Sequence, residues 1–369
     1  LPLFIYTYGL SLEQAGFLIL ANTALSSLLQ PLLGYISDKL NQPRLIAAGT
    51  LLSACSTGMM GFVSSYESLL VCATLAGVGS SIFHPEGAKI MNRLGGGKKG
   101  KAMGTFAIGG SSGFAFGPLF AGAIAYTVGA HGLAAFTVAG IIISTVLFLL
   151  MPRIVAHART IDQSVATENP TVAAQPLKNY WKYFGILFII ILSQSVNFRV
   201  INAFIPVFWT HELGTSPEQG SFALTVFFSI GIFMTYIGGL LGDKYGPIKI
   251  IRLSLLIWLP SMFLLTQVPE FSVTIMMPLA YLILLMIGAA KAISYSPVIV
   301  LGQTYLAKSI GFASGITLGV SQTIGGIIAP VVGNLADTYS LPAAMMTLVP
   351  FLIVGLVASL LLKDPNKLQ

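Results

Sequence analysis

The sequence predicts an all-α polytopic membrane protein, and three observations carry this prediction. Hydrophobic residues make up 55% of the 369 residues and charged residues only 8%, whereas about a quarter of a soluble globular chain is charged. The apolar runs continue over roughly 20 residues, the length at which a helix crosses the hydrocarbon. These runs do not alternate between polar and apolar at every second position, so helices are predicted rather than a β-barrel.

Eleven apolar segments follow one another along the chain, and each is interpreted as a membrane span. Polar or glycine-containing connections separate them. The segments cover residues 12–37, 45–64, 68–91, 102–127, 132–151, 183–209, 221–242, 248–267, 272–298, 312–335 and 341–362.

Charge divides the connections between these spans into two sets. All of the 19 Lys and Arg except Arg199 and Lys291 lie in or beside 38–44, 92–101, 152–182, 243–252, 303–311 and 363–369. The opposite set has no Lys or Arg and carries Glu13, Glu67, Glu212, Glu218, Glu270 and Asp337. The positive-inside rule places the first set, with the linker and C-terminus, on the cytoplasmic side. The net charge of +7 therefore reflects topology, and the expected partner is a lipid bilayer, not nucleic acid.

An internal repeat divides the chain into two halves. Residues 9–14 (GLSLEQ) recur as 214–219 (GTSPEQ), and 34–39 (GYISDK) recur as 239–244 (GLLGDK), both 205 positions later. A full helix precedes the second copy, so we expect a helix before residue 1 as well. The prediction is two six-helix bundles with pseudo-twofold symmetry, at 1–151 and 183–369. They are joined by a cytoplasmic linker, 152–182, that is too short to bury a core of its own.

The repeated loop follows the pattern G-x-x-x-D-[RK]-x-x-x-x-[RK]. Its small residue lets a neighbouring helix approach, and its basic residues hold the loop at the cytoplasmic face. The matching residues are Gly34, Asp38, Lys39 and Arg44 in the first half and Gly239, Asp243 and Lys244 in the second. This pattern resembles the signature loop of the major facilitator superfamily. The resemblance implies that each Asp meets a helix start in the other half and stabilises the state closed to the cytoplasm. The alternative is a charge pair that only fixes topology.

Glycine residues line one face of the fifth span, beside a proline. A face of this kind permits close helix packing next to a kink. The residues are Gly104, Gly113, Gly117, Pro118 and Gly122. They resemble the motif of the proton-antiporting, exporting branches of the superfamily. Those antiporters usually carry an Arg and a Gln near the start of the fourth span, where this chain has Ala73 and Ala76. Another group must then carry a coupled proton.

The stretch Ile82-Phe-His-Pro-Glu-Gly-Ala88, together with residues 302–337, resembles the fosmidomycin-resistance family of efflux proteins. The resemblance covers essentially the whole chain. It implies proton-driven export of small molecules, including an anionic phosphonate antibiotic. We accordingly expect a monomer in the bacterial inner membrane.

Four ionisable side chains lie at membrane depth, where they are costly and usually functional. Glu86 and His84 are the candidate proton carriers, and Pro85 is expected to take Phe83 and His84 out of regular helix. Arg199 and Lys291 are the candidate anion-binding groups. Supporting contacts to substrate are assigned to Phe83, Tyr295, Gln194, Asn197 and Asn202. The alternative for Glu86 is that it only neutralises Lys291 or Lys89.

Nothing in the sequence predicts covalent chemistry, a metal site or a cofactor. Residues 95–102 fit most of a phosphate-loop pattern but lack its Ser or Thr and follow a membrane helix. Cys55 and Cys72 lie inside spans without the spacing of metal ligands. The prediction is a transporter and not an enzyme, which exports a small anionic or amphipathic compound in exchange for protons. The remaining alternatives are a proton-coupled importer of an anionic nutrient, a lipid-modifying enzyme and a receptor.

Overall fold

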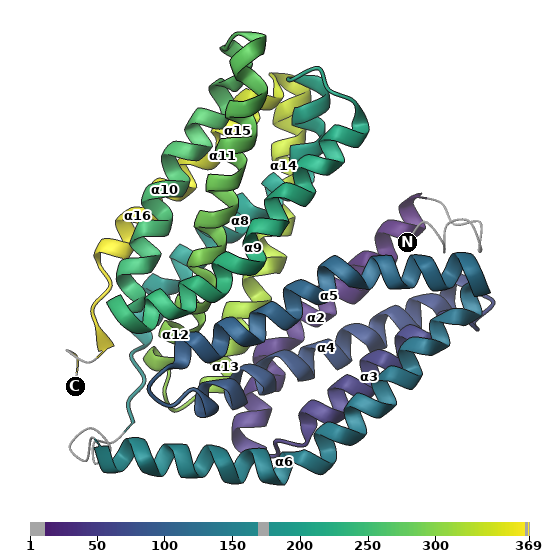
Figure 1. The fold of residues 1–369 in the computed structure, drawn as a ribbon, viewed down its shortest axis with the longest axis vertical. Coiled ribbons are helices and arrows are strands. Elements are labelled where there is room, and N and C mark those ends of the chain that lie inside the picture. The colour runs from purple at the N-terminus through teal and green to yellow at the C-terminus, as the bar shows by residue number, and fades with distance from the viewer. Residues whose placement is uncertain (1–11, 169–176, 366–367, 369) are drawn as a thin grey trace. The chain divides into compact units, whose positions relative to one another are not determined.

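The computed structural model describes residues 12–168, 177–365 and 368. Within these ranges the elements are helices joined by short turns, and the only extended pairing is an isolated bridge between Asn179 and Leu306 (Figure 1). The all-α prediction is therefore confirmed.

Seven of the described helices are long and apolar enough to cross a membrane. They cover Tyr66–Leu94, Ala130–Val165, Trp181–His211, Phe222–Tyr245, Pro247–Glu270, Ile275–Tyr305 and Leu341–Leu360. Shorter apolar helices cover Leu45–Met59 and Ile310–Val320. These lengths and compositions are those of a polytopic membrane protein.

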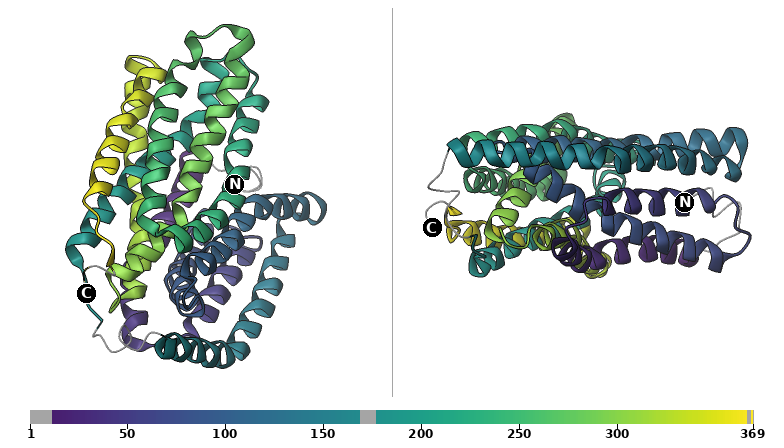
Figure 2. Two further views of the ribbon diagram at one scale, coloured as in Figure 1. Left: turned by 60° about the vertical axis from the view of Figure 1, so that its left-hand side comes forward. Right: turned by 90° about the horizontal axis from the view of Figure 1, so that it is seen from below.

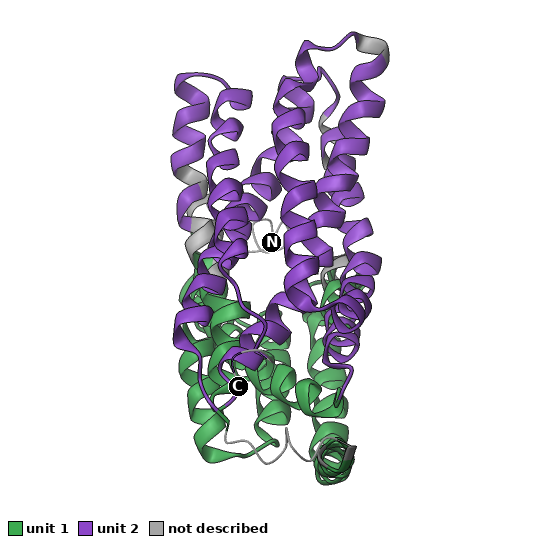
Figure 3. Cartoon of the chain, turned by 90° about the vertical axis from the view of Figure 1, so that its left-hand side faces the viewer, with its two compact units in different colours: residues 1–96, 109–177, 308–323 green, residues 97–108, 178–307, 324–369 purple. Residues whose placement is uncertain are grey.

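The chain divides into two compact units (Figure 3). Unit 1 contains residues 1–96, 109–177 and 308–323, and unit 2 contains residues 97–108, 178–307 and 324–369. Each unit thus takes a short segment from the other half of the sequence. The division into bundles at 1–151 and 183–369 stays a prediction.

In unit 1, α4 (Tyr66–Leu94) contacts α2 (Leu12–Leu40), α3 (Leu45–Met59), α6 (Ala134–Glu168) and α13 (Ile310–Gly315). Most of α5 (Lys99–Val128) and the 3₁₀ turn Ala130–Leu133 also belong to this unit. Where these helices cover α4, its polar residues Glu86, Lys89 and Asn92 are buried.

Helix α4 begins at a capped turn and continues through its proline. The Ser65 hydroxyl accepts a hydrogen bond from the Ser68 amide, which satisfies one donor of the first turn. The expectation that Pro85 would take Phe83 and His84 out of regular helix is wrong, because α4 is helical from Tyr66 to Leu94. Membrane helices tolerate an internal proline when neighbouring groups satisfy the freed backbone.

Helix α6 extends well beyond its expected membrane span. It runs from Ala134 through Pro152 to Glu168, and Figures 1 and 2 show that it changes direction along its length. A proline inside a helix is a common cause of such a bend. The first part of the predicted linker is therefore helical.

Unit 2 contains α8 (Trp181–His211), α9 (Pro217–Tyr245), α10 (Pro247–Gln267) and α11 (Val273–Ile293). It also contains α12 (Tyr295–Tyr305), most of α14 (Ser321–Thr338), α15 (Leu341–Met346) and α16 (Leu348–Leu360). Helix α8 contacts α9, α12 and α16, and α11 contacts α9 and α10.

The repeated Ser-x-Glu-Gln sequence has a structural reason in unit 2. Ser216 caps α9 by accepting from the Gln219 amide, while the Gln219 side chain accepts from the Ser216 amide. This reciprocal capping box satisfies two donors at the start of the helix. Ser11, the corresponding residue of the first copy, lies outside the described residues.

Two membrane segments depart from regular α-helix. The segment expected as one span over 272–298 lies within the single apolar span Ile275–Tyr305. One turn residue in it, Ser294, separates α11 from α12 while keeping α-helical backbone angles. Residues Ile316–Val320 form a π-helical turn between α13 and α14. Both irregularities are typical of functional positions in helical membrane proteins.

Candidate functional site

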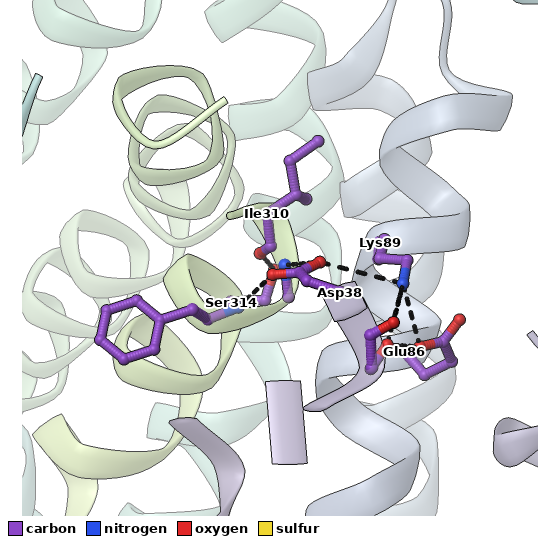
Figure 4. Close-up of polar contacts among 8 residues, drawn as sticks. Asp38, Glu86, Lys89, Ile310 and Ser314 are labelled. Atoms are coloured by element: carbon purple, nitrogen blue, oxygen red, sulfur yellow. Dashed lines mark hydrogen bonds and ion pairs between the residues drawn. The ribbon is translucent and has the colours of Figure 1, made fainter. Parts of the chain in front are cut away.

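The Asp38 contact joins the last turn of α2 to the first turn of α13 in unit 1. The Gly311 amide donates to Asp38 Oδ1 at 3.0 Å, and the Phe312 amide donates to Oδ2 at 3.1 Å (Figure 4). Gly311 and Phe312 are the second and third residues of α13, whose amides have no partner inside the helix. A carboxylate is therefore well placed to accept from both.

The Asp243 contact repeats this geometry in unit 2. The Gly100 amide donates to Asp243 Oδ1 and the Lys101 amide donates to Oδ2, both at 2.7 Å. Gly100 and Lys101 are likewise the second and third residues of their helix, α5. The two copies of the repeated loop thus make the same backbone contact.

The glycine of each loop permits the contact. A Cβ atom on Gly34 would collide with the backbone of Gly311, and one on Gly239 would collide with the backbone of Gly100. The helices therefore approach closely at both places, as a small residue at this position allows. The role of both loops in gating stays a prediction.

The basic residues of the loops rest on aromatic rings. Lys39 Nζ lies 4.7 Å from the centre of the Tyr35 ring. The Arg44 guanidinium lies 4.6 Å from the Phe148 ring, and Lys244 Nζ lies 5.0 Å from the Tyr245 ring. Cation–π contacts of this kind hold exposed cations weakly.

Glu86 lies on α4 beside the Asp38 contact and is fully buried. Its Oε2 atom accepts hydrogen bonds from the Ser37 hydroxyl and from Lys89 Nζ, the latter at 3.4 Å. Its Oε1 atom is also buried and has no hydrogen-bond partner among the described residues. Glu86 is therefore paired with Lys89, one of the two cations that the sequence offered as a neutralising partner.

Lys89 lies between Asp38 and Glu86 (Figure 4). Its Nζ atom is 3.8 Å from Asp38 Oδ1 and 3.4 Å from Glu86 Oε2. It also donates to the Ser37 carbonyl at 3.0 Å and to the Ser37 hydroxyl at 2.8 Å. The Lys89 ammonium group is thus paired with two carboxylates.

His84 and Phe83 precede this cluster on α4 and are half-buried. Their rings meet edge to face with centroids 5.6 Å apart. No hydrogen bond joins His84 to Glu86 among the described residues, so a shared proton role for His84 stays a prediction.

Lys291 and Arg199 form a second candidate site in unit 2. Lys291 Nζ lies 4.3 Å from the centre of the Phe198 ring and 5.2 Å from the Tyr295 ring. Phe198 is the neighbour of Arg199 on α8, and the Arg199 Nε atom is buried without a hydrogen-bond partner among the described residues. Neither cation forms an ion pair within the described part of the chain.

The polar residues assigned to substrate on α8 divide into two groups. Gln194 Oε1 accepts from the Ser294 hydroxyl at the turn between α11 and α12, and Gln194 Nε2 is buried with no partner among described residues. Asn197 is fully buried and donates to the carbonyls of Ser193 and Leu348, which ties α8 to α16. Asn202 is half-buried. Gln194 therefore lies with the Lys291 cluster, whereas the Asn197 amide nitrogen joins α8 to α16. Asn197 Oδ1 is buried without a partner among the described residues, and a substrate contact by Asn197 stays a prediction.

The glycine face of α5 packs closely only at its start. A Cβ atom on Gly104 would lie 3.0 Å from the Tyr236 backbone of α9. At Gly113 and Gly117 it would meet no described atom within 4 Å, and close packing at these two glycines stays a prediction. Pro118 and Gly122 lie outside the residues whose surroundings the structure describes.

Three residues of these sites were missed by the sequence reasoning. Ser37 stands beside Asp38 in the loop pattern, and Phe198 precedes Arg199, so proximity in sequence was the available signal. Ser294 had no signal beyond its place three residues after Lys291. The described residues contain no group of three His, Cys, Asp or Glu side chains arranged for a metal ion.

Comparison with known proteins agrees with this architecture. A family model described as Major Facilitator Superfamily matches residues 1–330 and 187–369. The fosmidomycin resistance protein of Escherichia coli (strain K12) is 29% identical over 346 residues, which cover 92% of this chain and 82% of the relative. An uncharacterised MFS-type transporter of Bacillus subtilis (strain 168), YfnC, is 28% identical over 366 residues, which cover 98% and 87%.

Solved structures share the fold. The transporter FucP, in an outward conformation, aligns with a TM-score of 0.73 and 16% identity over 99% of this chain and 93% of that one. The human organic anion transporter MFSD10 aligns with a TM-score of 0.75 and 15% identity over 96% and 87%. The family resemblance carried by the two loops is thereby confirmed. Since the family model matches the whole chain, this protein belongs to the Major Facilitator Superfamily and is a multi-pass membrane transporter, not an enzyme.

Proposed function

We propose that this transporter exports a small anionic or amphipathic compound across the bacterial inner membrane in exchange for protons, as a monomer that works by alternating access. The observation that carries this proposal is the pair of cations in unit 2. Arg199 and Lys291 lie within membrane-spanning helices and have no acidic partner among the described residues. A charge at membrane depth without a counterion is costly. The presence of two such cations in one unit therefore favours a role in binding an anion.

Unsatisfied donors around these cations support the same proposal. Arg199 Nε and Gln194 Nε2 are both buried without a partner among the described residues. A buried donor left unpaired costs about 1–3 kcal/mol, and more when it is charged. An anionic group of the substrate would accept from these donors and offset that cost.

The turn at Ser294 also supports a substrate site here. It follows Lys291 by three residues within the span Ile275–Tyr305, and the Ser294 hydroxyl donates to Gln194. This hydrogen bond joins the two helical segments that carry the cations.

Glu86 is the proposed proton carrier. It is a buried carboxyl group whose Oε1 atom has no partner among the described residues. That oxygen is available to take a proton without breaking an existing hydrogen bond.

Reconstituted vesicles with an imposed pH gradient test the proposal. Fosmidomycin is the first probe, because the name of the Escherichia coli relative supports a phosphonate, and organic acids and cationic dyes complete the panel. We expect anions to move against their gradient as protons move the other way. Movement of anion and proton in the same direction would favour the importer instead, and transport of cationic dyes alone would contradict the anion site.

Matched variants separate binding from coupling. R199Q and K291Q should weaken binding of the anion, whereas E86Q should abolish uphill efflux and retain exchange of substrate for substrate. N197A is the control on α8, because its amide contacts backbone carbonyls of α8 and α16. Normal proton-driven efflux by E86Q would remove Glu86 from the coupling role.

A further inference from the structure

The Asp38 contact lies beside a buried group of charges, of which the transport proposal uses only Glu86. Lys89 Nζ lies 3.4 Å from Glu86 Oε2 and 3.8 Å from Asp38 Oδ1. The Lys89 side chain is 9% exposed, and the side chains of Asp38 and Glu86 are 15% and 1% exposed. Asp38 in turn accepts from the amides that begin α13. A continuous chain of polar contacts therefore runs from Glu86 to the start of α13.

Other charges near this chain are few. Arg93 lies on α4, two turns beyond Glu86, and is paired with Asp162 of α6 at 3.9 Å. Lys39 of α2 is exposed and rests on Tyr35. Helices α3 and α13, which also pack on α4, contain no charged residue or histidine. Within the described part of unit 1, the Lys89 ammonium is therefore the group that touches both carboxylates.

We propose that Lys89 is a positioning residue that transmits the protonation state of Glu86 to the Asp38 contact, so that a proton on Glu86 weakens the hydrogen bonds from Gly311 and Phe312. This inference rests on the proposed role of Glu86 as the proton carrier. It adds a specific route by which the proton changes the strength of a helix–helix contact.

The physical step is a redistribution of one cation. When Glu86 is ionised, Lys89 is shared between Glu86 and Asp38. A proton that arrives at Glu86 Oε1 forms an O–H bond there and removes the charge, while Lys89 keeps its own protons. Asp38 is then the remaining carboxylate in contact with Lys89. The closer ammonium group then competes with the Gly311 and Phe312 amides for the oxygens of Asp38, which stays ionised, so the two amide hydrogen bonds become weaker.

The Asp243 contact provides an internal control. The repeat places Gly242 at the position of Ser37, and a Cβ atom on Gly242 would face the Pro297 ring. Among the described residues Asp243 forms no ion pair, whereas Asp38 is paired with Lys89. A proton on Glu86 should therefore leave the Asp243 contact unchanged.

Hydrogen exchange of backbone amides measures both contacts directly. The full chain is placed in lipid nanodiscs, and protection is followed for peptides that contain Gly311 and Phe312 or Gly100 and Lys101. Rates are corrected for the intrinsic effect of pH. In E86Q, which mimics the protonated carboxyl, protection at Gly311 and Phe312 should fall on the order of tenfold, while Gly100 and Lys101 keep theirs.

A second substitution tests the route through Lys89. E86Q/K89M removes the cation as well as the carboxylate, so Asp38 retains its full charge and protection at Gly311 and Phe312 should return to the wild-type value or above. Removing both members of a buried pair is usually tolerated, whereas K89M alone would leave Glu86 uncompensated. K89R keeps the cation and should retain the pH response.

The outcomes separate this inference from the proposed function. Unchanged protection in E86Q, an equal loss at both contacts, or the same loss in E86Q and E86Q/K89M would overturn the role of Lys89, whatever the transport assay gives. A further outcome is normal efflux by E86Q together with amide protection that falls at Gly311 and Phe312 and not at Gly100 and Lys101. In that case Lys89 links the two carboxyl groups, and the proton-carrier proposal fails. If efflux is lost and protection is unchanged, the proton carrier stands without this route.

Discussion

The Asp38 and Asp243 contacts share a backbone geometry and differ in what surrounds them. In each, a carboxylate accepts from the second and third amides of a helix, and a glycine four residues earlier allows the close approach. Around Asp38 lie Ser37, Lys89 and Glu86, which are polar and buried. At the Asp243 contact the position of Ser37 is taken by Gly242, and Asp243 forms no ion pair among the described residues.

This difference teaches which part of a duplicated structure can specialise. The backbone contact depends on helix ends and a glycine, and both copies keep them. The side chains packed beneath the contact are free to differ, because they do not form it. We infer that the two contacts hold helices in the same way, while only the Asp38 contact is equipped to respond to a proton.

The largest expected effect comes from adding a side chain at the glycine of each loop. G34A and G239A place a methyl group against the backbone of a neighbouring helix, which cannot shift cheaply. We expect a loss of about 1–3 kcal/mol of stability and of most transport in both variants, as for other overpacked sites. Thermal unfolding in detergent and vesicle transport measure these losses.

G113A is the matched control for the glycine variants. Its methyl group would meet no described atom within 4 Å, and alanine is favoured over glycine in a helix by about 1 kcal/mol. We expect unchanged or slightly raised thermal stability. A loss in G113A equal to that in G34A would show that helix glycines in this chain are sensitive for a reason other than close packing.

The next effect comes from neutralising each aspartate. D38N and D243N remove the charge from an acceptor of two hydrogen bonds, and each bond to a charged group contributes about 1.5–3 kcal/mol. Amide protection should fall at Gly311 and Phe312 in D38N and at Gly100 and Lys101 in D243N. In the wild-type protein, amide protection should depend on pH at Gly311 and Phe312 and not at Gly100 and Lys101. D38N should abolish this pH dependence, and D243N should leave it intact. An equal pH response in both variants would erase the distinction between the contacts.

A smaller effect is expected from converting one contact toward the other. S37G gives the Asp38 contact the residue found at Asp243 and removes the hydroxyl that binds Glu86 and Lys89. We expect a loss of about 1–2 kcal/mol, the cost of a hydrogen bond between buried polar groups. The pH at which efflux is half-maximal should shift, while transport at the optimum is largely retained. S37T restores the hydroxyl and is the control, and an unchanged pH profile in S37G would remove Ser37 from the charge network.

The smallest effect is expected at the edge of the network. Arg93 and Asp162 form an ion pair at 3.9 Å, with side chains that are 39% and 50% exposed. Exposed pairs contribute about 0–1 kcal/mol. D162N should therefore leave thermal stability and the pH profile of efflux nearly unchanged. A shift in D162N as large as that in S37G would mean that the charge on Glu86 is set by surface residues and not by its buried neighbours.

Several features of the fold followed from the sequence with little ambiguity. Composition and run length gave helices in a membrane, and the repeat at 34–39 and 239–244 gave two equivalent loops. The repeated Ser-x-Glu-Gln sequence marked a helix start that Ser216 and Gln219 form by mutual capping. These features depend on residues close in sequence or on the properties of a whole segment, which pattern and composition report directly.

Other features required the packed structure. The sequence placed Asn197 and Gln194 together as substrate contacts, but Asn197 is turned to α16 and Gln194 to Ser294. It gave no sign of the turn at Ser294 inside the span Ile275–Tyr305, where the Ser294 hydroxyl reaches Gln194. Which side of a helix a residue faces depends on its neighbours, and an apolar membrane segment has no polar face to reveal that side.

By itself, then, the sequence determined depth and duplication: which charges lie inside the membrane, and which loops are copies of each other. The tertiary structure decided the partners, and above all that Glu86 meets Ser37 and Lys89 beside Asp38. The reason is physical. Hydropathy and spacing fix the position of a residue along the helix axis, whereas a buried hydrogen bond depends on the rotation and approach of two helices that are distant in sequence.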